Sequence, residues 1–426
     1  MGGLARRVSY IKAFQNRSKF EVPTLFVDAG NLFTDDRFET GQLPADALTK
    51  NKWVVKAYGD FRHAAANISF ADLPYLAELF KKDGFDKRAQ EYPFLNKLIS
   101  ANIQPQNDTL RAPAPYVIRE ITLKRSAPGK KLRIGIVGFT EPKPSMEGGG
   151  FLESYAGFRV EDPAAAAKRI LPELKQKADI IVALAYMPQI KAQLLATENP
   201  EIDTVIGARQ VNNQNEVQHF NRATITYAYN QTKFLGELRY YLKGDGTIEN
   251  QINRFVGLDS FIPDDPGAQA TVTAAHTEFT NLQTTGAQQQ TSANLPLTSA
   301  LSTGNSEYVG AQACAVCHQE EYEIWEKSGH AHAMATLEGK NQQFDNECVG
   351  CHVVAFQKEG GFQSLVTTPQ LANVQCEACH GPGRKHIESP AKGFGFMEVP
   401  TGCVQCHTQP NSPDFDFAVY WPQIAH

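Results

Sequence analysis

Eight cysteines and four histidines in the C-terminal part of the chain form one repeated pattern, Cys-x-x-Cys-His. In this spacing the two thiols add to the vinyl groups of a haem, and the histidine becomes the proximal ligand of the iron. The four copies use every cysteine of the chain, so the sequence predicts four covalently attached c-type haems. The copies are Cys314-Ala-Val-Cys317-His318, Cys348-Val-Gly-Cys351-His352, Cys376-Glu-Ala-Cys379-His380 and Cys403-Val-Gln-Cys406-His407.

Two other uses of paired cysteines are possible in principle. Zinc ribbons contain Cys-x-x-Cys pairs, and a disulfide framework needs an even number of cysteines. Neither requires a histidine directly after the second cysteine of every pair. The repeated histidine therefore favours haem attachment over both alternatives.

Four further histidines in the same stretch are candidates for the opposite iron ligand. Imidazoles on both faces of a haem give low-spin iron suited to electron transfer. His330 and His332 lie two residues apart and point to different sides of a helix, so they cannot ligate the same iron face. The role of His332 is therefore open. The candidate metal ligands are His330, His332, His386 and His426.

The residues around these motifs are unlike those of a conventional hydrophobic core. The stretch is short, rich in Gly, Pro, Gln and Lys, and has little apolar periodicity. Small domains of this kind need covalent cross-links or bound metal groups to be stable. Four macrocycles would supply the missing apolar volume, so we expect this segment to fold only with haem.

The whole sequence sets broad limits on function. Its 426 residues, 42% of them hydrophobic, give room for about two or three domains. The net charge of −5 is spread without a long charged run, which argues against a nucleic-acid partner. No apolar run approaches the ~18 residues that a membrane span needs, so we expect no transmembrane segment.

The N-terminal residues, Met-Gly-Gly-Leu-Ala-Arg-Arg, lack the apolar stretch of a secretory signal. Covalent c-type haem is attached outside the cytoplasm. We therefore expect a periplasmic or extracellular protein whose given sequence is processed or truncated at its start.

The first 260 residues alternate short apolar runs with helical patterns, which is typical of an α/β domain. Helices are predicted at residues 162–177, which open with Asp-Pro, and at residues 264–282. Residues 223–242 and 244–256 are predicted to form a hairpin around Gly244-Asp245-Gly246. Buried strands are predicted at residues 24–28, 98–103, 116–123, 132–139, 179–185 and 204–206.

Residues 283–307 are rich in Thr, Gln, Ser, Asn and Ala and have almost no charge. That composition is typical of an extended or flexible linker. It divides the chain into a first domain at residues 1–282, a linker at residues 283–307 and a second domain at residues 308–426.

Several segments of the first domain match, in the same order along the chain, the motifs of one enzyme family. They include Leu25-Phe-Val-Asp-Ala-Gly-Asn31, Leu98-Ile-Ser-Ala-Asn-Ile103 and Ile134-Gly-Ile-Val-Gly-Phe-Thr140, followed by residues 178–187 and 202–211. Through these segments the chain resembles calcineurin-like metallophosphoesterases of the 5′-nucleotidase branch, and the resemblance covers residues 3–257. The resemblance implies an α/β fold, a β-sandwich with flanking helices. The first motif of that family, a metal-binding Asp-x-His, is absent because the sequence starts too late to contain it.

The positions that ligate two metal ions in that family hold other residues here. Asn31 stands at the position of a bridging Asp, and Phe70-Ala71-Asp72 stands where the family has Asn-His-Glu. Tyr186 replaces a histidine, and Arg209 and Val211 replace a histidine pair. Two dications need several oxygen or nitrogen donors, which Phe, Ala and Val cannot provide. We expect no catalytic residues and no metal site in this domain.

Three further segments of the second domain are distinctive: Trp325-x-x-Ser-x-His330-Ala, the run from Cys376 to His386 containing Cys-His-Gly-Pro-Gly, and Trp421-x-x-Ile-x-His426. In these segments the second domain is similar to the bacterial tetrahaem cytochrome c family that serves hydroxylamine oxidoreductase. The resemblance implies that His330 and His386 are distal haem ligands. His426 is the next candidate, and His332 has no counterpart. The same resemblance also implies that one haem can be five-coordinate.

These observations predict an extracytoplasmic multihaem cytochrome that transfers electrons, with a small, mostly helical or irregular haem domain. The phosphoesterase-like domain is expected to be a scaffold, a docking module or an assembly surface, and to be non-catalytic. Expected partners are redox proteins such as other multihaem cytochromes, with a homo-oligomer or filament also possible. Two alternatives are a haem oxidoreductase acting on a small substrate at a five-coordinate haem, and a metal-dependent phosphoesterase or 5′-nucleotidase with an electron-transfer tail.

Overall fold

The chain forms two compact units, Met1–Ala275 and His276–His426, in the computed structural model. No helix among the described residues is long and apolar enough to cross a bilayer. The described residues are 3–18, 23–33, 43, 45–59, 61–123, 128–145, 150–152, 154–209, 217–227, 234–292, 306–340, 342–343, 346–356, 358–365, 368–395, 399, 401–408 and 411–426.

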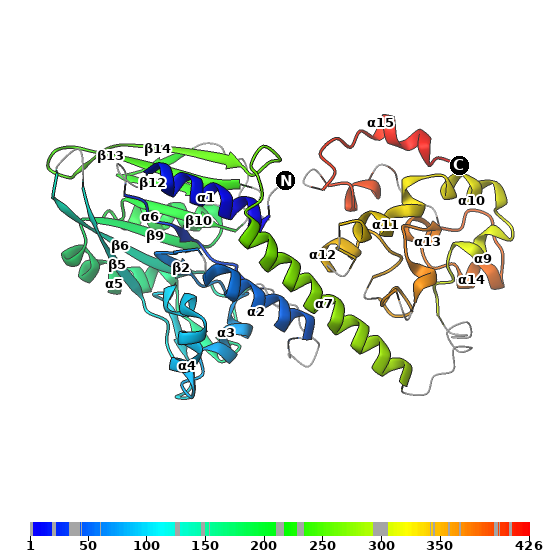
Figure 1. Ribbon diagram of the computed structural model, residues 1–426, viewed down its shortest axis with the longest axis horizontal. Helices are drawn as coiled ribbons and strands as arrows, with labels where there is room; N and C mark the ends of the chain where they lie inside the picture. Colours follow the sequence, from blue (N-terminus) through cyan, green and yellow to red (C-terminus); the bar gives the residue numbers. More distant parts are fainter. Residues whose placement is uncertain are drawn as a thin grey trace. The chain divides into compact units, whose positions relative to one another are not determined.

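A six-stranded sheet forms the centre of the first unit (Figure 1). Its strand order is β11-β12-β10-β9-β6-β5; the four inner strands are parallel, and each edge strand is antiparallel to its neighbour. All seven residues of β9 are buried, as expected for a parallel strand covered on both faces. The strands are β5 (Tyr116–Thr122), β6 (Lys131–Thr140), β9 (Ile180–Tyr186), β10 (Thr204–Ala208), β11 (Gln218–Phe220) and β12 (Ala223–Tyr227).

Helices α5 (Pro163–Lys177) and α6 (Gln189–Glu198) pack on one face of this sheet. α5 begins as its sequence predicts, because the Asp162 carboxylate accepts the Ala165 N–H at 3.2 Å and a proline occupies the first turn. Its apolar stripe ends in Leu174, which is fully buried against the sheet. Burial of one such leucine contributes about 1.5–3 kcal/mol.

A second layer covers the other face of the sheet. β1 (Val27–Asp28), β2 (Ala65–Asn67) and β3 (Leu98–Ile99) pair in parallel, and β13 (Phe234–Leu242) pairs with β14 (Ile248–Gly257) as a hairpin. One hydrophobic cluster joins side chains of both layers, so the first unit is a β-sandwich with flanking helices. This confirms the predicted fold class. The remaining elements of the layer and its flanks are α1 (Leu4–Ser18), α2 (Ala45–Gly59), α3 (Leu73–Leu79), α4 (Phe85–Glu91), β4 (Ile103–Pro105), β7 (Ser154–Tyr155) and β8 (Phe158–Val160).

The predicted hairpin is wrong in its first strand. Residues 223–227 form β12, which pairs in parallel with β10 inside the six-stranded sheet. The hairpin is instead β13 with β14, and the amide of Gly246 donates to the carbonyl of Lys243 at its turn. All five residues of β12 are buried, and a fully buried strand is most stable in the centre of a covered sheet.

The helix predicted at residues 264–282 is longer than expected. α7 spans Pro266–Ser292 and so includes the first ten residues of the predicted linker. Residues 283–292 contain one glycine, no proline and four glutamines, and glutamine is a good helix former. Residues 293–305 lie outside the described residues.

The second unit consists of short helices joined by irregular segments, as the sequence predicts, and no strand is assigned among its described residues. Its hydrophobic cluster contains Met334, Leu337, Val349, Val353, Val354, Phe362, Leu371 and Ala372. The helices used below are α9 (Ala311–Ala315), α10 (Gln319–Glu326), η3 (Gly329–His332), α11 (Ala333–Glu338), α13 (Cys376–His380), α14 (Arg384–Glu388), η5 (Cys403–Gln405) and η6 (Trp421–Gln423).

Candidate haem-binding site

The cysteine motifs lie on single turns of helix. In the first motif, the amide of His318 donates to the carbonyl of Cys314 at 2.9 Å. In the fourth, the amide of His407 donates to the carbonyl of Cys403 at the same distance, 2.9 Å. Residues three and four apart are neighbours on such a turn, so both thiols and the histidine of a motif share one side. Attachment of one haem requires this arrangement.

Three motif histidines face a second histidine ring. Two metal–imidazole bonds of about 2 Å each, with the half-width of each ring added, span roughly 6 Å. Each pair therefore fits an iron atom with one imidazole on either side. The ring centres lie 6.1 Å apart for His318 and His386, 6.0 Å apart for His407 and His330, and 5.8 Å apart for His380 and His426.

The opposing histidines come from three different places in the second unit. His386 lies on α14, His330 lies on η3, and His426 follows η6 at the end of the chain. Val374 is bonded both to η3 and to the preceding helix α10. The Val374 amide donates to the His330 carbonyl at 3.1 Å, and the Trp325 indole of α10 donates to the Val374 carbonyl at 2.7 Å. Trp325 therefore anchors the segment that carries His330.

Hydrogen bonds at Nδ1 orient several of these rings. An Nδ1–H that donates to an oxygen leaves the Nε2 lone pair free for a metal. Burial and the neighbouring His407 ring lower the pKa of His330, which favours the neutral form that ligates metal. The Nδ1 contacts are 2.6 Å from His352 to the Ala333 carbonyl, 2.6 Å from His380 to the Gly395 carbonyl, 3.0 Å from His407 to the Ser412 hydroxyl and 2.9 Å from His426 to the Ile424 carbonyl.

The second motif differs from the other three. Within the described residues, no ring contact joins His352 to another histidine. His332, a candidate ligand whose role the sequence leaves open, is exposed at the end of η3 and has no ring contact with a motif histidine in the described part of the chain.

Thiols of different motifs lie next to one another. A hydrogen bond joins Cys314 to Cys376, which raises the pKa of Cys314 and lowers that of Cys376. Burial, together with a hydrogen bond to Cys351, raises the pKa of Cys406 to about 12. The first motif is thus adjacent to the third, and the second is adjacent to the fourth. Haems attached at these thiols would be close neighbours.

The residues at the positions that, by the resemblance, hold metal ligands in metallophosphoesterases come together as a packed cluster. Phe70 and Tyr186 make an edge-to-face contact at 5.6 Å, and the Arg209 guanidinium lies 5.2 Å from the Phe70 ring centre. Arg209 also forms an ion pair with the buried Glu141 at 2.9 Å. An arginine and two aromatic rings do not fit a pair of dications. Val211 lies outside the described residues.

Asp72, at the position of a family Glu, has a structural role. Its buried carboxylate accepts N–H groups from Asn31 at 3.2 Å, Leu32 at 2.7 Å, Phe33 at 2.8 Å and Ser69 at 2.7 Å. These bonds hold the turn after β1 in place, with Asn31 at φ 67°. The carboxylate has no capacity left to act on a substrate or ion.

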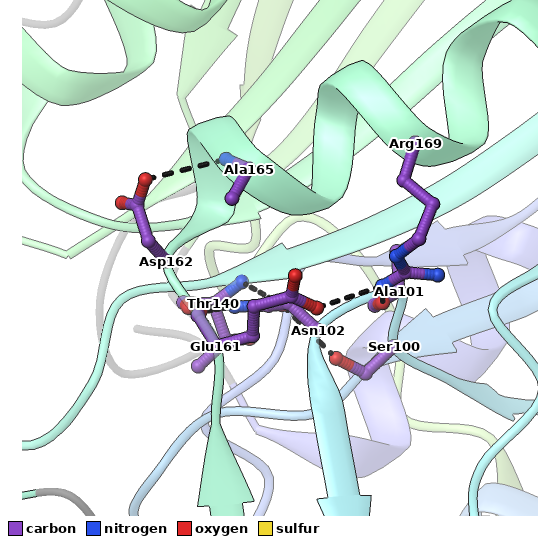
Figure 2. Close-up of polar contacts among 8 residues, drawn as sticks. All are labelled: Ser100, Ala101, Asn102, Thr140, Glu161, Asp162, Ala165 and Arg169. Carbon is purple, nitrogen blue, oxygen red and sulfur yellow. Dashed lines mark hydrogen bonds and ion pairs between the residues drawn. The ribbon is translucent and has the colours of Figure 1, made fainter.

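The Leu98–Ile103 motif is likewise a structural junction (Figure 2). The Asn102 amide donates to the carbonyls of Thr140 at 2.6 Å and Glu161 at 2.7 Å, and its oxygen accepts the Thr140 N–H at 3.0 Å. From α5, Arg169 reaches the Ala101 carbonyl at 3.1 Å and the Glu161 carboxylate at 2.7 Å. The motif therefore ties the end of β6 to α5.

A cavity of about 1260 Å³ lies between the two layers of the first unit. Its floor is one face of the six-stranded sheet, and its walls include consecutive residues of the β1 segment, 23–32, and of β13, 234–242. Successive strand residues point to opposite faces, so a lining by consecutive residues means that strand edges border the cavity. Among the described strands, β1 pairs only with β2, and β13 pairs only with β14.

Comparison with known proteins separates the two units. Residues 313–381 match the family model described as cytochrome c554 and c-prime. The second unit is similar to cytochrome c554. A relative, cytochrome c-554 of Nitrosomonas europaea, is 34% identical over 95 residues, which is 19% of this chain and 40% of that protein. The chain therefore covers less than half of this relative. The second unit, His276–His426, is thus similar to c-type cytochromes over residues 313–381 and is called the cytochrome unit below.

The first unit is similar in fold to several solved structures. The sulfate thiohydrolase SoxB of Thermus thermophilus superposes with a TM-score of 0.52 at 14% identity, over 66% of this chain and 48% of that one. A 5′-nucleotidase precursor, also of Thermus thermophilus, has a TM-score of 0.49 at 18% identity and covers 66% of this chain and 54% of its own. The calcineurin-like phosphoesterase YfkN of Bacillus subtilis has a TM-score of 0.48 at 20% identity and covers 65% of this chain and 89% of its own. At these identities the likeness is one of fold alone.

Proposed function

We propose that this protein is an extracytoplasmic electron carrier with four covalent haems in its cytochrome unit. The observation that carries the proposal is the set of three opposed histidine pairs, each with the ring separation that one iron between two imidazoles requires. Haem supplies one-electron chemistry, and the chain supplies attachment, axial ligation and close spacing of the groups. Covalent haem attachment, which occurs outside the cytoplasm, supports a location in the periplasm or outside the cell.

Each haem takes its attachment and ligands from a defined set of residues. The paired cysteines of each motif form the thioether bonds. The proposed axial pairs are His318 with His386, His380 with His426, and His407 with His330. His352 is the proximal ligand of the second haem.

The experiment removes one opposing histidine at a time in the full holoprotein. His330→Ala, His386→Ala and His426→Ala should each convert one low-spin haem to high spin and leave four haems attached. His219→Ala, in the first unit, is the matched control and should change no haem signal. If none of the three substitutions alters the absorption or EPR spectrum, the assigned pairs are wrong.

The second haem supports a second candidate function, a reaction of a small substrate at an open iron face. The observation behind it is that His352, unlike the other motif histidines, has no histidine ring opposite it among the described residues. A parent protein with one high-spin haem, unchanged by His332→Ala, would support this function. If the parent instead has four low-spin haems and His332→Ala converts one of them to high spin, His332 is the fourth distal ligand.

For the phosphoesterase-like domain, extending to the linker at residues 283–307, we propose docking or assembly rather than catalysis. The packing of Phe70, Tyr186 and Arg209 supports the loss of hydrolysis. The two strand edges that border the cavity support docking, because an extended segment of a redox partner or a second copy can pair with such edges.

Three measurements test this domain. Elemental analysis of dialysed holoprotein should find haem iron and less than one equivalent of manganese or zinc, and nucleotide turnover with added manganese should be absent. Sedimentation should show a concentration-dependent oligomer if assembly is homomeric. A monomer at all concentrations would leave only a different partner as the occupant.

A further inference from the structure

Glu377 is a buried acidic residue inside the third haem motif, between Cys376 and Cys379. The residue is 5% exposed, and its carboxylate accepts three backbone N–H groups. The donors are Val309 at 3.0 Å, Gly310 at 2.8 Å and Gly383 at 2.7 Å. In the described part of the chain no ion pair joins it to a basic side chain, so these amides alone balance its charge.

The three amides belong to the two segments that carry the axial ligands of the first haem. Gly310 is the residue before α9, which leads into the first motif and His318. Gly383 is the residue before α14, which carries His386. One carboxylate of the third motif therefore fixes the starting points of both segments.

Neighbouring contacts reinforce the same junction. The Gln375 side-chain oxygen accepts the Ala311 N–H at 2.6 Å, and the Arg384 guanidinium donates to the Ser306 carbonyl at 3.0 Å. Cys314 of the first motif and Cys376 of the third also lie next to each other at this junction. The residues that start the first motif are thus bonded to those that surround the third.

We propose that Glu377 is a positioning residue that sets the span between His318 and His386 and lowers the reduction potential of an adjacent haem through its buried charge. The inference rests on the proposed haem ligation. A hydrogen-bonded partner of a ligand segment fixes ligand geometry, and a net negative charge near a haem stabilises its oxidised form. The charge has this effect because Glu377 is buried and has no cationic partner among the described residues.

The test is Glu377→Gln in the holoprotein, followed by redox titration and EPR. Glutamine has nearly the same shape but no charge, and its amide nitrogen cannot accept the backbone N–H groups. We expect four haems to remain, one midpoint potential to shift to a more positive value, and the low-spin signal of one haem to change. The matched control is Glu321→Gln: Glu321 lies 3.9 Å from His318, but its side chain is 43% exposed, so solvent screens its charge and the shift should be smaller.

Glu377→Asp separates charge from geometry. The shorter side chain keeps the charge but cannot reach all three amides, so it should alter the EPR signal more than the potential. If Glu377→Gln lowers the unfolding temperature while every potential and signal stays fixed, the residue has only a structural role and the proposal is wrong. If Glu377→Gln fails to retain haem, the aspartate variant decides: an unchanged EPR signal would overturn the proposal. Failure of the ligation scheme itself would appear separately, as His318→Ala and His386→Ala variants with unaltered spectra.

Discussion

Asp72 stands where the resemblance to metallophosphoesterases implies a Glu, and its carboxylate accepts four backbone N–H groups, three from the turn after β1 and one from Ser69. Asp72→Asn keeps the shape but replaces one accepting oxygen with an NH₂ group that faces backbone donors. Each buried donor left without a partner costs about 1–3 kcal/mol, so we expect the first unit to lose about 3 kcal/mol of stability. Chemical denaturation followed by tyrosine fluorescence measures the loss. Asp108→Asn, at an exposed position, is the control and should have no effect.

His63 makes the first unit sensitive to acid. The ring is 4% exposed, stacks on Tyr58 with ring centres 5.0 Å apart, and neither ring nitrogen has a partner among the described residues. Burial lowers the pKa of His63 to about 4. The unfolded chain, with an ordinary histidine pKa of about 6.5, binds more protons between these two values, so stability falls as pH drops from about 6.5 to 4.

The corresponding substitution is His63→Phe, which keeps an aromatic ring in the same cluster. It should remove about 3 kcal/mol of the stability difference between pH 6.5 and pH 4. The measurement is the unfolding midpoint at several pH values. Equal pH dependence in the parent and the variant would show that His63 does not titrate with unfolding.

At the scale of elements, Glu237 fastens the hairpin to the N-terminal helix. On β13 its carboxylate accepts from Arg254 of β14 at 2.6 and 3.0 Å, from Arg239 at 3.0 Å, and from the Tyr10 hydroxyl of α1. Burial alone would raise the pKa of Glu237, but these hydrogen bonds lower it to about 2. A depressed acid pKa gives stability that is present above the unfolded value of about 4.3 and is lost as pH falls towards 2.

Glu237→Gln tests this contact between elements. Hydrogen bonds to charged groups contribute about 1.5–3 kcal/mol each, but the two arginines are partly exposed, so we expect a total loss of about 2 kcal/mol at neutral pH. Hydrogen exchange should rise in α1, β13 and β14 and stay constant in β9. A uniform rise across the first unit would indicate global destabilisation rather than loosening of the hairpin.

At the scale of the whole molecule, the cytochrome unit and the phosphoesterase-like unit should respond differently to loss of a haem. Cys376→Ala with Cys379→Ala should lower the intact mass by one haem and destabilise the cytochrome unit, because Glu377 and Gln375 at this motif hold the start of the first motif. The first unit, with its own hydrophobic core, should unfold at an unchanged temperature. Mass spectrometry and calorimetry check both outcomes. Fewer than four haems in the mature parent would contradict the proposed count.

The sequence alone determined the features that depend on short separations along the chain. Cysteine and histidine at positions i, i+3 and i+4 form a haem motif on a single turn, whatever surrounds them. Runs of apolar residues predicted the positions of β6, β9 and β10, because a parallel strand covered on both faces must be apolar throughout.

Tertiary structure decided the pairings between distant residues. The pattern of apolar residues at 223–227 indicates a strand but not the strand that pairs with it. The pattern therefore predicts β12 in a hairpin, whereas β12 pairs with β10. Nothing near Arg209 in the sequence indicates that Glu141 neutralises it. The position of His330 opposite His407 depends on how η3 and η5 pack, since a ligand pair is defined by distance in space and not along the chain.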